Sequence, residues 1–285
     1  MPPEAAPTWA EFVTGLDLFL DPMLCGAVAG LVLGFLGVYV VLRRMVFVSA
    51  AITHSAGLGV ALTFYAQIHL SWLGSLANPF VGAFLLGIGS TLLLVANPAR
   101  LGLTRESLIG LVFIFASGTA LLVADRISQE SHDIHSIIFG TAVLVSKGDL
   151  YTTLGTGSLT MLLHLWLRRA LIFTSFDADG ARVQGLPTRA LDGLLLASIG
   201  LMVSVTTRAL GAMPVFAFSV LPAMTALSLG RRLSAVFTLA AMLGLLSAVL
   251  GYLAAFFLRF PVGACQTVVA ALFAALAMAL RALRR

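Results

Sequence analysis

Charged residues are scarce in this chain of 285 residues. They make up 10% of the sequence, whereas 60% is hydrophobic and the mean hydropathy is +1.04. A water-soluble fold of this size carries about 25% charged residues to cover its surface. The composition therefore excludes a soluble or disordered protein. It predicts an all-α fold, a polytopic membrane bundle of about nine helices, because nine spans of about 20 residues use roughly 180 positions and leave only short loops.

Signatures of the common enzyme classes are absent. The single lysine, Lys147, lies between Ser146 and Gly148, so no G-K-[ST] phosphate loop exists. None of the five histidines begins H-E-x-x-H, and no G-x-S-x-G elbow occurs. Asp125, Asp149 and Asp192 fall at span ends, which argues against an intramembrane aspartyl protease. We therefore expect that the chain is not an enzyme.

Cysteine is also rare in this chain. Cys25 and Cys265 are the only two, and both lie in apolar stretches. Two such residues cannot build a disulfide framework or a thiolate metal site, so we expect small buried hydrophobes.

The hydropathy predicts nine spans in one transmembrane domain, residues 23–280, after an extracytoplasmic N-terminal tail, 1–22, and before a basic cytoplasmic tail, 281–285. The predicted spans are 23–42, 47–66, 79–96, 106–124, 150–167, 190–208, 212–229, 234–257 and 262–280.

The basic residues predict the orientation of these spans. With the N-terminus outside, the cytoplasmic connections hold 13 of the 17 basic residues. The positive-inside rule thus predicts an external N-terminus and a cytoplasmic C-terminus. The basic residues come as pairs at span ends, such as Arg43-Arg44, rather than as the dense patch of a nucleic-acid site, so we expect no nucleic-acid partner.

Three local patterns add detail to the predicted spans. The apolar run within 136–146 is too short to cross a bilayer, which suggests a re-entrant or interfacial segment. Gly26, Gly30 and Gly34 recur on one face of the first span, a pattern typical of close helix packing. Pro214 and Pro222 interrupt the seventh span; Pro222 is thus predicted to break the helix or to line a path.

One histidine stands in the second span. His54 lies near mid-membrane within Thr53-His54-Ser55, followed by Gly57 and Gly59. An ionisable side chain there is expensive and indicates a functional site, and a neutral imidazole suits zinc and neighbouring divalent metals. The alternative is a hydrogen bond to another helix, a purely structural role.

The chain resembles the permease subunits of zinc/manganese/iron ABC transporters. The segment from Gly37-Val38-Tyr39-Val40-Val41-Leu42-Arg43-Arg44-Met45 through Thr53-His54-Ser55 to Gly59-Val60-Ala61-Leu62 is similar to the family's G-V-F-V-V-L-R-R-M, D-A-L-S-H-A and P-G-V-A-L motifs. Further similar segments follow in order: Phe139-Gly140, Phe176-Asp177 with Ala181 and Gly185-Leu186-Pro187, and Gly211-Ala212 with Leu221-Pro222-Ala223-Met224-Thr225-Ala226. Together they cover about residues 22 to 280.

The resemblance implies a permease of an ATP-driven metal importer in the bacterial cytoplasmic (inner) membrane. Its expected partners are two cytoplasmic ABC ATPase subunits, a second permease subunit and an extracytoplasmic metal-binding protein. The divalent metal ion is the substrate, zinc or manganese first and iron next, and no cofactor is bound permanently. The resemblance places His54 on the translocation path.

The resemblance also implies a cytoplasmic coupling helix around residues 174–188 that receives the movement of the ATPase. Asp177, Ala181 and Gly185 recur every fourth residue, so they are expected to share one face of a short helix. Gly185-Leu186-Pro187 is a helix stop. The alternative is a solvated loop with a capped turn.

One position departs from the family pattern. Ala50 stands where the family has aspartate, four residues before His54, so the expected oxygen ligand is missing. Three explanations stay open: a non-identical permease supplies the carboxylate, two copies of His54 meet across a two-fold axis, or the substrate has changed. Leu58 likewise replaces the family's proline.

Weaker candidates complete the set. His132, Asp133 and His135, beside Glu130, could pass a cation from the binding protein into the pore, although such runs are more often solvated loops. His69 and His164 have no clustered partners and are expected to be structural. The alternatives to metal import are transport of a metal chelate such as a siderophore or haem, and a non-transporting membrane scaffold or receptor.

Overall fold

The computed structural model describes residues 8–69, 78–95, 104–128, 145–230 and 232–283. Every element within these ranges is a helix, which confirms the all-α prediction. The helices are α1 (Trp9–Thr14), α2 (Leu16–Leu42), α3 (Val46–His69), α5 (Pro79–Val95), α6 (Arg105–Ser128), α8 (Lys147–Trp166), α9 (Arg168–Phe176), α10 (Ala178–Val183), α11 (Thr188–Leu210), α12 (Ala212–Leu229), α13 (Leu233–Leu258) and α14 (Val262–Leu283).

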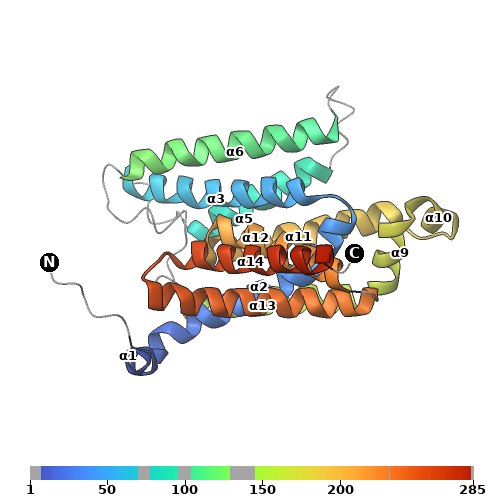
Figure 1. Ribbon diagram of the computed structural model, residues 1–285. Helices are drawn as coiled ribbons and strands as arrows, with labels where there is room; N and C mark the ends of the chain where they lie inside the picture. Colours follow the sequence, from blue (N-terminus) through green and yellow to red (C-terminus); the bar gives the residue numbers. More distant parts are fainter. Residues whose placement is uncertain (1–7, 70–77, 96–103, 129–144, 231, 284–285) are drawn as a thin grey trace.

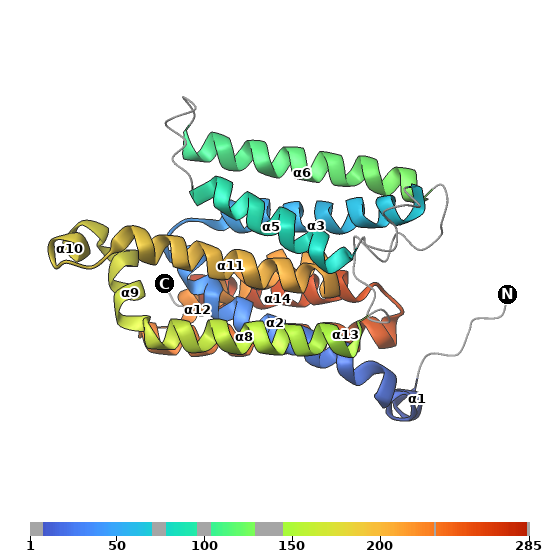
Figure 2. The same ribbon diagram turned by 180° about the vertical axis from the view of Figure 1, so that it is seen from behind.

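The long helices run roughly lengthwise beside one another (Figures 1 and 2). The short helix α10 projects beyond one end of the bundle, here named the α10 end, and α1 lies at the opposite end. At that opposite end α11 turns into α12 through Gly211, so it is named the Gly211 end. The turn needs glycine because Gly211 has a φ of 89°.

Seven of the described helices are long and apolar enough to cross a bilayer: α2, α3, α6, α11, α12, α13 and α14. Two more coincide with predicted spans: α5 is a shorter apolar helix of 17 residues, and α8 is a 20-residue helix. The predicted ranges therefore agree with the helices to within a few residues at most ends. An exception is α2, which begins at Leu16, so that residues 16–22 of the predicted tail belong to a helix.

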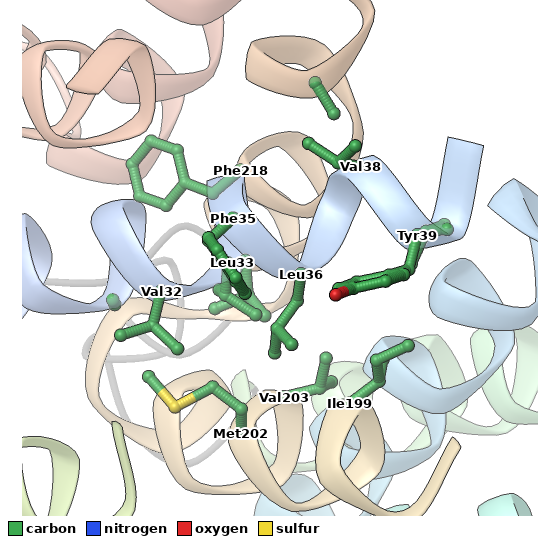
Figure 3. Packing of buried hydrophobic residues seen from close by; sticks show 14 of the residues in the cluster. Val32, Leu33, Phe35, Leu36, Val38, Tyr39, Ile199, Met202, Val203 and Phe218 are labelled. Atoms are coloured by element: carbon green, nitrogen blue, oxygen red, sulfur yellow. The ribbon is translucent and has the colours of Figure 1, made fainter. Parts of the chain in front are cut away.

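Helix α2 forms the centre of the core. Its side chains Leu36 and Tyr39 are almost completely buried, and they lie against α11 beside Ile199 and Val203 (Figure 3). Phe218 of α12 packs on the other side of α2. The other helices are thus organised around one uniformly apolar helix that contacts several neighbours.

The glycine stripe of α2 packs closely, as predicted. A Cβ atom on Gly30 would meet the carbonyl oxygen of Gly244 in α13, and a Cβ on Gly34 would meet the carbonyl oxygen of Ala240. A Cβ on Gly26 would lie 3.1 Å from Nε2 of Gln266 in α14. The missing side chains let the backbones of α2 and α13 touch.

The seventh predicted span is not broken by its prolines. Pro214 lies in the first turn of α12, where no N–H is needed, and Pro222 lies inside the continuous helix. The prediction of a helix break at Pro222 is therefore wrong for this structure. Pro222 has no N–H for the carbonyl group of Phe218, yet packing on the buried face of α12 preserves the helix.

Candidate functional site

A cavity of about 320 Å³ lies among α3, α6, α11 and α12. Its wall includes His54 of α3, Ser117 of α6, Thr207 of α11, and Met213 and Phe216 of α12. The other lining residues are glycine, alanine and aliphatic side chains. The α11 and α12 residues come from the turns around Gly211, so the cavity lies toward the Gly211 end.

His54 is the residue of α3 that lines this cavity nearest to the α10 end. Its ring packs edge-on against Phe113 of α6, with ring centroids 4.9 Å apart and planes at 83°. Phe113 precedes Ser117 by one helical turn, so α6 both orients the imidazole and contributes the neighbouring hydroxyl group. His54 thus lines a cavity, while its predicted place on the translocation path and its role as a metal ligand both stay predictions.

Four of the lining residues carry a polar or polarisable group: His54 an imidazole, Ser117 and Thr207 a hydroxyl, and Met213 a thioether. Thr207 donates its hydroxyl proton to the carbonyl oxygen of Val203 at 2.7 Å, which leaves its oxygen lone pairs as acceptors. The hydroxyl oxygen of Ser117 is buried and has no hydrogen-bond partner among the described atoms.

Among the residues that the structure describes, the cavity wall contains no carboxylate. Among the described residues, no three His, Cys, Asp or Glu side chains gather in a group that could hold a metal ion. Ala50, one helical turn before His54, is 2% exposed and does not line the cavity. The described part of the cavity wall thus offers a single imidazole with neutral companions, which is too few strong ligands for a closed divalent site.

The predicted coupling segment consists of two short helices that leave the bundle. Helix α9 ends at Phe176, and Asp177 caps α10 by accepting a hydrogen bond from the N–H of Gly180 at 2.8 Å. After α10, the N–H groups of Gly185 and Leu186 bond to the carbonyl oxygens of Arg182 and Ala181, both at 3.0 Å. These two hydrogen bonds form the Schellman motif that ends many helices. The motif needs glycine at position 185 because the backbone φ there is +80°. The predicted helix stop is confirmed.

The expected common face of Asp177, Ala181 and Gly185 is wrong. Only Ala181 belongs to α10, because Asp177 precedes the helix as its cap and Gly185 follows its end. Ala181 is fully buried against its own chain, so it cannot itself contact a partner. The exposed apolar side chains of the segment are instead Phe176 and Val183, with exposed fractions of 63% and 88%.

The other predicted site residues either lie outside the described residues or do not line the cavity. His132, Asp133, His135 and Phe139-Gly140 lie outside the described residues, as does most of the predicted re-entrant segment. Pro222 is buried and does not line the cavity. His164 is fully buried in α8, where its Nδ1 N–H donates to the carbonyl oxygen of Thr160 at 2.9 Å and its Nε2 lies 3.3 Å from Oγ of Ser198 in α11.

The cysteines form no bridge. Cys25 is completely buried, with its sulfur 3.5 Å from Oγ1 of Thr153, and Cys265 is partly buried. Both are free. The prediction of a buried hydrophobe holds for Cys25 and only partly for Cys265.

Sequence reasoning missed Ser117, Thr207 and Met213 of the cavity wall. A single serine, threonine or methionine in an apolar span carries no distinctive spacing, and these three come from three helices. Only the packing of α6, α11 and α12 brings them to His54.

Comparisons with known proteins agree with this architecture. The chain is 30% identical over 268 residues to the manganese import system permease protein ScaB of Streptococcus parasanguinis, covering 92% of this chain and 91% of that one. It is 27% identical over 256 residues to the chelated iron transport system membrane protein YfeD of Yersinia pestis, covering 90% and 83%. The solved structure of PsaBC from Streptococcus pneumoniae in complex with Fab superposes with a TM-score of 0.79 at 27% identity, covering 95% of both chains.

The family assignment rests on almost the whole bundle, because residues 16–281 match one family model. That range begins with α2 and includes α14 nearly to its end, and it contains the cavity and the α9–α10 segment. The chain therefore belongs to the ABC 3 transport family.

Proposed function

We propose that this chain is the membrane-spanning permease subunit of an ATP-driven importer for a divalent transition-metal ion, zinc or manganese first and iron next. The observation that carries the proposal is the position of His54 in the wall of a cavity between four helices. Imidazole is a good ligand for zinc, iron and neighbouring metals. The ion enters this cavity, contacts His54 and leaves toward the α10 end.

The proposed topology has nine spans, a cytoplasmic C-terminus and an external N-terminus. Two features support it: α1 and the last turn of α14 lie at opposite ends of the bundle, and α10 lies at the same end as the last turn of α14 (Figures 1 and 2). The positive-inside rule then places the α10 end in the cytoplasm. We propose the bacterial cytoplasmic membrane as its location.

The proposed partners follow from what the chain lacks. The sequence has no phosphate loop, so ATP is hydrolysed by separate ABC ATPase subunits that dock at the α9–α10 segment. The exposed Phe176 and Val183 support docking there. A second permease subunit, identical or homologous, completes the pore, and an extracytoplasmic binding protein delivers the metal.

The weak ligand set of the cavity requires further donors. A second copy would bring another His54, and a homologous permease would bring the missing carboxylate. Either source raises the number of strong ligands toward the four that zinc prefers. No permanent cofactor is proposed, because a transported ion has to leave the site.

A second candidate substrate is a metal chelate. The cavity is large for a bare ion, and its described wall is mainly apolar, with no carboxylate to replace the water around a free cation. A chelator supplies the metal ligands itself and presents an organic surface that suits an apolar wall. One relative, YfeD, is named for chelated iron transport.

The test is ATP-dependent uptake by the chain reconstituted in liposomes with its cognate ATPase and binding protein. Zinc, manganese and iron are supplied as radioactive free ions or as siderophore and haem complexes. Uptake of a free ion supports the ion importer, and uptake of complexes alone supports the second candidate. No ATP-dependent uptake of either form contradicts both and favours the scaffold reading.

A further inference from the structure

The guanidinium group of Arg43 joins three helices at the α10 end. Arg43 caps the C-terminus of α2, and its side chain is 12% exposed. Its Nε donates to Oγ of Ser175 at 2.8 Å and its Nη2 donates to Oγ1 of Thr174 at 3.0 Å, both in α9. Its Nη1 forms an ion pair with the carboxylate of Asp192 in α11.

The two acceptors in α9 are arranged for this cation. The hydroxyl groups of Thr174 and Ser175 both donate their protons to the carbonyl oxygen of Leu171, at 3.2 and 2.6 Å. Their lone pairs are therefore left for Arg43. A planar guanidinium group can reach two hydroxyls and a carboxylate at once, whereas the ammonium group of lysine cannot reproduce this fork.

The position of this cluster in the chain is informative. Helix α9 leads into α10, and a connection of four residues separates α10 from α11. Arg43 therefore joins α9 and α11, the two helices on either side of the projecting α10. Figure 2 shows α9, α10 and α11 next to one another at this end of the bundle. Without this tie, a displacement of α10 could bend α9 and α11 separately.

Helix α11 connects the α10 end with the cavity. It is continuous over 23 residues, about 35 Å at 1.5 Å per residue, and Thr207 in its last turn lines the cavity. The next residue, Arg208, forms an ion pair with Asp149 of α8. One ion pair near each end thus joins α11 to its neighbours, to Arg43 at the α10 end and to α8 beside the cavity. The continuous helix between these two points can transmit a displacement as a rigid element.

We propose that Arg43 is a positioning residue for energy coupling, which joins α9 and α11 into one unit so that displacement of α10 moves the cavity wall at Thr207. This inference rests on the proposed function, in which an ATPase acts on α10. Arg43 contacts neither the substrate nor ATP in this account. Its effect is on the number of ions transported for each ATP hydrolysed.

The test measures uptake and ATP hydrolysis together in liposomes that contain the complete complex. Arg43→Gln is compared with Arg44→Gln, which changes the neighbouring exposed arginine. We expect Arg43→Gln to leave ATP hydrolysis within about twofold of wild type and to lower uptake about tenfold, the upper range for changes along a coupling network. Arg44→Gln should change the ratio of uptake to hydrolysis little.

A second variant tests the proposal independently, in case Arg43→Gln misfolds. Thr174→Val combined with Ser175→Ala removes the α9 acceptors and retains the ion pair of Arg43 with Asp192. It should show the same loss of uptake per ATP, and it decides the matter if Arg43→Gln does not assemble. Unchanged ratios, or a parallel fall of uptake and hydrolysis in both variants, overturn the proposal. If the wild-type complex shows no ATP-dependent uptake, the proposed function itself fails, which is a separate result.

Discussion

Gly30 of α2 and Gly244 of α13 meet backbone to backbone, so that a Cβ atom added to either would overlap the carbonyl group of the other. The contact joins the central helix α2 to α13, whose small residues Gly244 and Ala240 face the glycines of α2. Neither carbonyl group can move without distorting its helix. The pair therefore fixes how closely α2 and α13 approach.

Gly30→Ala should destabilise the protein by about 1–3 kcal/mol, the cost of overpacking a close contact. The matched control is Gly155→Ala in α8, where a Cβ meets nothing within 4 Å. That change should be neutral or stabilise by up to about 1 kcal/mol, because alanine is the better helix former. Unfolding in mixed micelles with increasing denaturing detergent measures both, and equal stability of the two variants would contradict the packing account.

Asp149→Asn should destabilise the Gly211 end of the bundle by about 2 kcal/mol, less than a fully buried pair would lose because the Arg208 side chain is 31% exposed. The carboxylate also receives the N–H of Ser146 at 3.0 Å in the capping box of α8. The control is Asp179→Asn, which removes an exposed partner 3.4 Å from Arg182 and should change the stability very little. The same detergent titration compares them; a larger loss for Asp179→Asn would refute the assignment.

Gly185→Val should abolish uptake while the protein still assembles in the membrane. The φ of +80° at this position costs a β-branched residue about 1–2 kcal/mol, so the turn after α10 would open and displace the proposed docking segment. Gly185→Asn should retain most of the uptake, since asparagine tolerates this conformation. Co-purification of the ATPase with each variant is the measurement. Full ATPase binding and uptake by Gly185→Val would show that the shape of the turn is unimportant.

Ala50→Asp places a carboxylate one turn from His54 at a buried position outside the cavity wall, so it tests whether the longer side chain reaches the ion. If it does, uptake of manganese relative to zinc should rise by about tenfold, because a carboxylate is the harder ligand. Ala50→Asn has the same size without the charge and should leave the ratio unchanged. Uptake from an equimolar mixture of the two ions gives the ratio directly. If both variants shift the ratio equally, the effect is one of size, and position 50 supplies no ligand.

The sequence predicted those features that depend on local pattern. Hydropathy alone located the long helices, since apolar runs of span length have few other folds available. The glycine spacing in α2 predicted close packing, and Gly185-Leu186-Pro187 predicted the end of α10. Each of these signals lies within a single segment of the chain.

Features that depend on several segments could not be predicted in this way. The cavity residues Ser117 and Thr207 belong to different helices, and the partners of Arg43 lie more than 130 positions away. The four-residue spacing of Asp177, Ala181 and Gly185 was misleading, because capping by Asp177 and the stop at Gly185 limit α10 to six residues. The continuity of α12 through Pro222 likewise depends on its packing, which no proline pattern reveals.

The most direct test of the account is ATP-dependent metal uptake by His54→Ala compared with His69→Ala. Both changes remove an imidazole from α3, but only His54 lines the cavity. We predict that His54→Ala loses most uptake of the transported ion, whereas His69→Ala transports nearly as well as wild type. Wild-type uptake by a correctly assembled His54→Ala complex would contradict the claim that the ion passes His54.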